Sequence, residues 1–304
     1  MGSLTYSIVA RDPETGRLGV AVQSHWFSVG SVVSWAEAGV GAVATQSFAE
    51  PSYGPLGLEL MRRGRSAPEA LETLVRADED RAVRQIAFVD VNGDVGVHSG
   101  DGCIRAFGHA TGQGFSVQAN MMEHDTVWGS MADAYASAEG DLPDRLLAAL
   151  AAAQAQGGDI RGMQSAAMLV VEAEPTGAEW RDRVIDLRVE DHPTPVEELA
   201  RIVRLWRAYG HAERAEELEL QGDLESAAAA RLASLETQPD HPELAFWAAI
   251  AMAQAGRLDD ARTTIAVARA ARPGWAELLR RIVADGQIEL DDAALATLLA
   301  DEPS

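Results

Sequence analysis

Over about its first 200 residues the chain alternates between the patterns of buried strands and of helices. Short runs of Val, Ile, Leu and Ala between turn residues predict strands, whereas apolar residues every three or four positions predict helices. The predicted strands are 5–10, 18–22, 29–35, 41–45, 85–90, 95–99, 103–107, 115–120, 166–171 and 184–189. The predicted helices are 56–63, 66–77, 125–138 and 143–156. This order, with paired helices between groups of strands, favours a layered antiparallel α+β domain over a doubly wound parallel sheet.

Local turn and capping signals support these elements. Ser66 and Glu69 have the spacing of a capping box, with Pro68 in the first helical turn. Asn92-Gly93 lies between two predicted strands and is a strong hairpin signal.

From Pro195 onward the pattern is helical, and the sequence repeats with a period of 34 residues. Four pairs lie 34 apart: Gly222 and Gly256, Leu224 and Leu258, Ala227 and Ala261, Pro239 and Pro273. The period and the residue types resemble the tetratricopeptide repeat. We therefore predict two domains, residues 1–200 and 201–304, the second an all-α repeat module.

Within this module, one copy spans 208–241, and the next contains helices at 243–255 and 258–270. Two repeats bury little apolar surface, so 196–207 and 275–299 are expected to cap the pair. Two interpretations stay open for the module. Residues 208–304 either support self-association or packing, which predicts a homo-oligomer, or form a groove that binds a protein partner.

Charge narrows the range of partners. The chain of 304 residues has 25 Lys and Arg against 47 Asp and Glu, a net charge of -22. Such a chain repels phosphate backbones and anionic membrane surfaces, so neither nucleic acid nor membrane is an expected partner. The single cysteine and the lack of a secretory pattern or an 18-residue apolar run indicate a cytoplasmic protein.

Two apparent motifs fail on context. Residues 39–44 match the dinucleotide fingerprint G-x-G-x-x-A, but a strand pattern rather than a helix follows. Residues 90–94 begin like a calcium loop, yet Val95 and Asp101 stand where Gly and Glu are required. The seven histidines have no metal-ligand spacing, and Cys103 is interpreted as a small buried residue. We therefore expect no cofactor and no metal.

Thr5 is the residue with a plausible catalytic chemistry, because it opens the first predicted hairpin near the start of the chain. A terminal threonine acts as a nucleophile with its own α-amine as base. The reference pKa of an α-amine, about 7.7–8.0, suits that role.

Several segments in order resemble the bacterial family called domain of unknown function 1028, which belongs to the N-terminal-nucleophile (Ntn) hydrolase superfamily. They are 5–12, 19–24, 39–46, 53–55, 118–121, 158–167 and 191–193, and the resemblance covers about residues 4–200. It implies a four-layer αββα sandwich and hydrolysis of an amide bond in a small or peptide-like substrate.

Carried over by position, the resemblance implies a set of site residues at strand ends. Thr5 is the nucleophile, Asn120 donates to an oxyanion, and Ser165 orients the amine. The implied substrate-binding residues are Gln23, Ser24, His25, Thr45, Gln46, Arg161 and Gln164. Arg161 is expected either to pair with Asp159 or to hold a substrate carboxylate.

One departure concerns the start of the chain. Members of this family typically begin Met-Thr, whereas here Met1-Gly2-Ser3-Leu4 precedes Thr5, so the Thr5 nitrogen is an amide. Four explanations stay open: self-cleavage between Leu4 and Thr5, translation from position 4, residues added in cloning, or a domain without hydrolase activity that binds a ligand or protein through its repeats.

Overall fold

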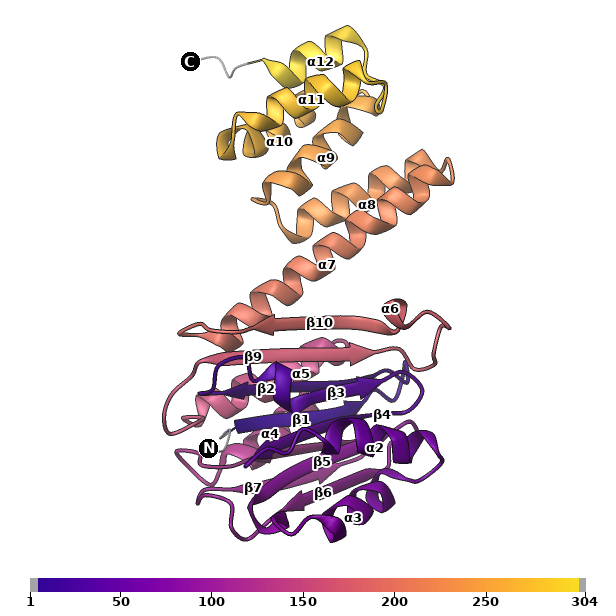
Figure 1. The fold of residues 1–304 in the computed structure, drawn as a ribbon. Helices are drawn as coiled ribbons and strands as arrows, with labels where there is room; N and C mark the ends of the chain where they lie inside the picture. The colour runs from indigo at the N-terminus through magenta and orange to yellow at the C-terminus, as the bar shows by residue number, and fades with distance from the viewer. Residues whose placement is uncertain (1–4, 301–304) are drawn as a thin grey trace. The chain divides into compact units, whose positions relative to one another are not determined.

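The computed structural model describes residues 5–300, and the chain forms two compact units that divide between Arg201 and Ile202. Residues 1–4, which bear on the processing of Thr5, lie outside the described residues. Figure 1 shows the elements of each unit.

A six-stranded antiparallel sheet forms one inner layer of the first unit. Its order is β10-β9-β2-β1-β8-β7, so β1 lies at the centre between β2 and β8. Its strands are β1 (Thr5–Arg11), β2 (Leu18–Ser24), β7 (Gly108–Gly112), β8 (Phe115–Ala119), β9 (Ser165–Val171) and β10 (Arg183–Val189).

A four-stranded antiparallel sheet of order β3-β4-β5-β6 forms the second inner layer. Its strands are β3 (Ser34–Glu37), β4 (Gly41–Ser47), β5 (Arg84–Asp90) and β6 (Val95–Ser99). Small and branched side chains from both sheets fill the space between them, among them Val9, Val20, Val22, Ala42, Ala44, Ala87, Val89 and Leu169.

Helices cover both outer faces. On the six-stranded sheet lie α4 (Val127–Ser137) and α5 (Leu142–Ala155), and on the four-stranded sheet lie α2 (Tyr53–Arg62) and α3 (Ala67–Ala77). Three short helical segments complete this unit: α1 (Gly30–Val33), α6 (Glu179–Asp182) and the 3₁₀ turn η1 (Arg81–Val83). The predicted αββα layering is confirmed.

The prediction of one strand over 29–35 was wrong. Residues 30–33 form α1, and the strand β3 begins at Ser34. The Val29 amide donates to Ser165 Oγ at 3.0 Å, and the Val33 amide donates to the Val29 carbonyl at 3.0 Å. These contacts outweigh the strand preference of a valine-rich segment.

The strand predicted over 103–107 was also wrong, because these residues form a loop and the strand β7 lies at 108–112. Its sequence, Gly-His-Ala-Thr-Gly, carries almost no apolar signal. The strand exists because β7 pairs with β8 across a turn in which Gly114 has a φ of 73°.

Helix α2 lies close to its sheet because glycine faces the sheet. A Cβ at Gly57 would overlap the Phe88 ring of β5, and one at Gly54 would overlap the Trp35 ring of β3. These two positions need glycine because a neighbouring ring fills the place of a Cβ, and not because the backbone adopts a conformation that only glycine allows.

We expect Gly57→Ala to destabilise the protein by about 1–3 kcal/mol, since the extra methyl must displace a buried ring. In an exposed helix the same change stabilises by up to about 1 kcal/mol. Gly129→Ala provides the control, because Gly129 is an exposed position of α4 with open space around its Cα. Urea midpoints of both variants test the sign; stabilisation by Gly57→Ala would contradict the packing argument.

The second unit is helical. It contains the later part of α7 (Pro195–Leu220), then α8 (Leu224–Thr237), α9 (Pro242–Gln254), α10 (Leu258–Ala271), α11 (Gly274–Ala284) and α12 (Asp292–Leu299). Its core includes Phe246, Ala249, Ala261, Ile265, Leu279 and Leu298. No helix among residues 5–300 is long and apolar enough to cross a membrane.

Glycines of the second unit end its helices in the left-handed conformation. Gly222, Gly256 and Gly286 have φ values of 79°, 77° and 67°. After each, the next amide donates to the carbonyl five residues earlier, as from Arg257 to Met252 at 2.9 Å. This is the Schellman arrangement, which favours glycine.

Candidate functional site

Thr5 opens the central strand of the six-stranded sheet and is fully buried. Its register partner on β2 is Ser24, whose partner on β9 is Ser165. Since register partners point to the same face, three hydroxyl residues form a row across three strands.

Hydrogen bonds hold the hydroxyl and the carbonyl of Thr5. The hydroxyl donates to Ser24 Oγ at 3.1 Å. The carbonyl accepts from the Asn120 amide at 3.1 Å, from Asn120 Nδ2 at 3.3 Å and from Gln46 Nε2 at 3.1 Å. The position of Thr5 is therefore determined by both sheets.

Buried amide side chains connect Thr5 to the facing sheet. Gln85 Oε1 accepts from Gln46 Nε2 at 2.8 Å and from Asn120 Nδ2 at 2.9 Å. Ser7 Oγ donates to Gln46 Oε1 at 2.5 Å and accepts from Gln118 Nε2 at 2.6 Å. All these side chains are buried, so each bond replaces one to water.

The residues directly after Gln46 and Asn120 have strained backbone. Ser47 and Met121 have φ values of 70° and 58°, and a side chain in this region costs about 1–2 kcal/mol. Such positions cluster at functional sites, where the surrounding structure holds them.

Comparisons with known proteins agree with this architecture. A model of the family of unknown function DUF1028 matches residues 5–199. The chain belongs to the DUF1028 family. A similar DUF1028 structure is the crystal structure of protein SPO2555 from Silicibacter pomeroyi, which is 31% identical with a TM-score of 0.60. The match covers 66% of this chain and 88% of that one.

A tetratricopeptide repeat model matches residues 218–285, within the second unit. The search of curated proteins finds no match.

The predicted site residues of the DUF1028 unit do not all meet. Thr5, Ser24, Gln46 and Asn120 are in contact, and Ser165 continues the hydroxyl row. Ser165 Oγ donates to the Trp26 carbonyl at 2.5 Å, so it holds the loop after β2.

The side chains of Gln23 and Thr45 lie on the outer faces of their sheets, away from the cluster around Thr5. Gln23 is the register partner of Tyr6, whose hydroxyl donates to Gln154 of α5 at 3.1 Å. Gln23 is fully buried, and neither its Nε2 nor its Oε1 has a hydrogen-bond partner among residues 5–300. Thr45 Oγ1 donates to the Glu50 carbonyl at 3.1 Å.

The remaining predicted residues connect loops. Arg161 Nη2 pairs with Asp159 Oδ2 at 2.7 Å, and the same carboxylate oxygen accepts from the His25 amide at 3.2 Å. Gln164 donates its amide to the Ser24 carbonyl at 3.1 Å and its side chain to Asp191 at 3.1 Å. These contacts hold the loops after β2 and before β9 together.

Sequence reasoning missed Ser7, Gln85 and Gln118. A signal existed in β1 and β8, where polar residues occupy alternate positions of otherwise apolar strands: 5 and 7, then 116, 118 and 120. This alternation marks one polar stretch on an inner face. Gln85 had no such pattern, because it joins the cluster only when the sheets stack.

Cys103 is buried, which raises the pKa of its thiol, so the reactive thiolate is disfavoured. Among residues 5–300, no cluster of three His, Cys, Asp or Glu side chains could hold a metal ion.

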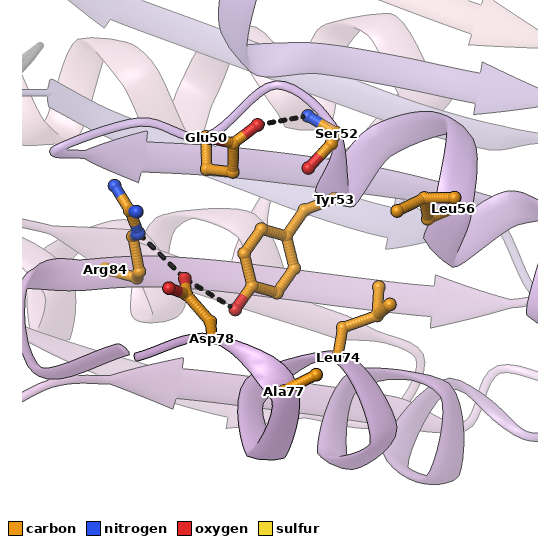
Figure 2. A pocket seen from close by; sticks show the side chains of 8 residues that line it. All are labelled: Glu50, Ser52, Tyr53, Leu56, Leu74, Ala77, Asp78 and Arg84. Carbon is orange, nitrogen blue, oxygen red and sulfur yellow. Dashed lines mark hydrogen bonds and ion pairs between the residues drawn. The ribbon is translucent and has the colours of Figure 1, made fainter. Parts of the chain in front are cut away.

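A small pocket of about 250 Å³ lies between α2 and α3. Figure 2 shows Tyr53 and Arg84 both directed at Asp78. Asp78 Oδ2 accepts from the Tyr53 hydroxyl at 3.1 Å and from Arg84 Nε at 2.9 Å. The polar groups that line the pocket thus bond to one another. These bonds connect α2, the residue that follows α3, and β5.

The pKa directions match this cluster. Burial by itself raises the pKa of Asp78, but hydrogen bonds from Arg84, the Asp80 amide and Tyr53 outweigh it and lower the pKa. Burial and the Asp78 carboxylate raise the pKa of Tyr53. Because the Asp78 pKa is lower when folded, its contribution to stability is present above the unfolded pKa of about 3.9 and is lost as pH falls through the folded value.

We expect Asp78→Asn to lower the free energy of unfolding at pH 7 by about 2 kcal/mol, since it removes the carboxylate that pairs most closely with the largely buried Arg84 guanidinium. The loss shrinks as pH falls below about 3.9, because the Asp78 carboxylate protonates first in the unfolded chain and then, at lower pH, in the folded one. Asp80→Asn is the control: Asp80 lies 3.5 Å from the same Arg84, but its side chain is 77% exposed, so we expect less than about 0.5 kcal/mol. Equal losses in the two variants, from urea unfolding, would contradict this reasoning.

The second unit contains a larger groove of about 1030 Å³. Its apolar lining comes from α8, α9, the loop before α12 and α12 itself: Leu224, Ala227, Ala228, Trp247, Ile250, Ala251, Ala253, Ala255, Ile288, Leu290 and Ala294. This volume is in the upper range of protein ligand sites.

Proposed function

We propose that this DUF1028 protein is an Ntn-type amidohydrolase in which Thr5 is the nucleophile. The observation that supports it best is the position of Thr5, at the start of the central strand, with its hydroxyl bonded to Ser24 and its carbonyl held by three donors. Nucleophilic catalysis requires this kind of fixed hydroxyl.

In the proposed reaction Thr5 Oγ1 attacks the amide carbonyl and its proton passes to the Thr5 α-amine. The tetrahedral intermediate collapses, the protonated α-amine gives its proton to the leaving nitrogen, and an ester forms on Thr5. Water, deprotonated by the same amine, then hydrolyses the ester and releases the acid. The cycle requires that the bond between Leu4 and Thr5 be cut, so that the amine is free.

Asn120 is proposed to orient that amine. Both hydrogens of its Nδ2 are already donated, to the Thr5 carbonyl and to Gln85 Oε1. Its buried Oδ1 has no hydrogen-bond partner among residues 5–300 and is an acceptor beside Thr5. An amine N–H is a suitable donor for it. This differs from the oxyanion role that the family resemblance implies.

The substrate is proposed to carry an apolar group next to the amide. The Met121 amide donates to the Ile104 carbonyl at 3.2 Å, and the Ile160 amide donates to the Met121 carbonyl at 3.3 Å. Ile104 and Ile160 are 40% and 54% exposed, directly beside the segment that follows Asn120. Exposed apolar side chains next to a polar centre are typical of ligand sites.

The test begins with intact mass and N-terminal sequencing of the protein expressed from its own gene. The sequence contains no lysine, so the α-amine is the one primary amine of the chain. An amine-reactive reagent therefore labels the terminus alone, and labelling across a pH series reports the amine pKa. A chain that begins at Thr5, and loses hydrolysis when labelled, supports the proposal.

With a chain that begins at Thr5, chromogenic anilides with apolar acyl groups serve as first substrates. We expect Thr5→Ala to reduce hydrolysis by at least about a thousandfold, and Thr5→Ser to retain part of it, because the hydroxyl remains. Thr73→Ala is the matched control, since Thr73 is an exposed threonine of α3. Normal turnover by a folded Thr5→Ala variant would rule this mechanism out.

A second function is proposed for the helical unit, which is to bind a protein partner. The groove of about 1030 Å³ favours it. Leu224 lines this groove and is 68% exposed, whereas Leu220 is 90% exposed and lies outside the lining.

The test is a capture experiment with the full-length protein, labelled at its terminus. We expect the Leu224→Ser variant to lose the captured partner and the Leu220→Ser variant to keep it. Equal capture by both variants would contradict the assignment of the groove, whatever the outcome of the hydrolysis assay.

A further inference from the structure

The groove of the helical unit combines an apolar floor with an acidic rim. Its charged lining comprises five carboxylates, those of Glu216, Glu219, Glu225, Glu289 and Asp291, and one guanidinium, that of Arg231. Any partner seated there meets a net negative charge as well as apolar surface.

The one cation of the lining is already neutralised. The Arg231 side chain is 6% exposed, and its Nε and Nη2 contact the two oxygens of Glu219 at 3.2 and 3.1 Å. Its guanidinium also lies over the Trp247 ring, 5.3 Å from the centroid. A bidentate, stacked arginine is held by the protein itself and leaves no cation to receive an acidic ligand.

Two of the carboxylates have no such internal partner. The side chains of Glu225 and Glu289 take part in no hydrogen bond or ion pair among residues 5–300, and both residues are exposed. Asp291, in contrast, accepts the Ala294 amide at 2.7 Å and caps α12. Glu225 and Glu289 are therefore the rim charges that can receive a cation from outside.

We propose that the groove binds a cationic, amphipathic segment of another protein, with apolar side chains on the floor and Lys or Arg against Glu225 and Glu289. This inference rests on the second proposed function and adds the chemistry of the partner. Charge complementarity selects the occupant. A second copy of this chain is a poor candidate, since each copy carries a net charge of -22.

The test uses three labelled helical peptides of about 14 residues with identical leucine positions. Their remaining positions carry Lys, Gln or Glu. Fluorescence anisotropy with the full-length protein is expected to give a Kd for the Lys peptide at least about tenfold below that of the Gln peptide, with no saturation by the Glu peptide. The preference should fall as salt rises, because exposed charges are screened.

Charge-reversed variants separate the groove from the overall charge. We expect Glu225→Lys with Glu289→Lys to weaken binding of the Lys peptide by at least about tenfold. Glu236→Lys with Asp285→Lys changes the net charge equally at two exposed positions outside the lining, near the ends of α8 and α11, and should leave the Kd within about twofold. Circular dichroism confirms that each variant is folded.

The outcomes are distinct. Equal binding of the Lys and Gln peptides would overturn the charge inference and leave the groove as a binding site. Equal weakening by the two double variants would also overturn it, since net charge alone would then explain the preference. Binding of none of the peptides would count against both the inference and the partner-binding function.

Discussion

Polar groups placed between two stacked sheets must find their hydrogen bonds inside the protein, and this constraint organises the DUF1028 unit. The Thr5 carbonyl, the amides of Gln46, Gln85 and Asn120, and the hydroxyl of Ser7 satisfy one another across both sheets. A buried amide without a partner costs about 1–3 kcal/mol. The stacked sheets therefore have one alignment in which these bonds form, whereas purely apolar faces could slide.

The same constraint acts on charge in the helical unit. Arg231 lies 34 residues before Ile265, an apolar core residue of the next repeat, and the structure accommodates the arginine with Glu219 and the Trp247 ring. Breaking such a pair is destabilising, although replacing the whole set by apolar residues often is not.

Much of this architecture could be predicted from local patterns, and the failures have physical causes. The layered antiparallel α+β domain followed from the order of strand and helix patterns, its αββα layers from the family resemblance, and the helical unit from the 34-residue spacing. The residues around Val29 were mispredicted because a contact with Ser165, distant in sequence, decides their conformation. Gln85 escaped notice for the same reason, since its role exists only after β5 packs opposite β8.

The glycines that end successive helices have a consequence for how the helical unit can change in length. Each of Gly222, Gly256 and Gly286 stops its own helix through bonds made within that helix's last turn. No neighbouring helix is required to set the boundary. Duplication or loss of a whole repeat would carry its stop signal with it, so insertions in multiples of a repeat preserve the register of the core, whereas an insertion within a helix shifts every buried position after it.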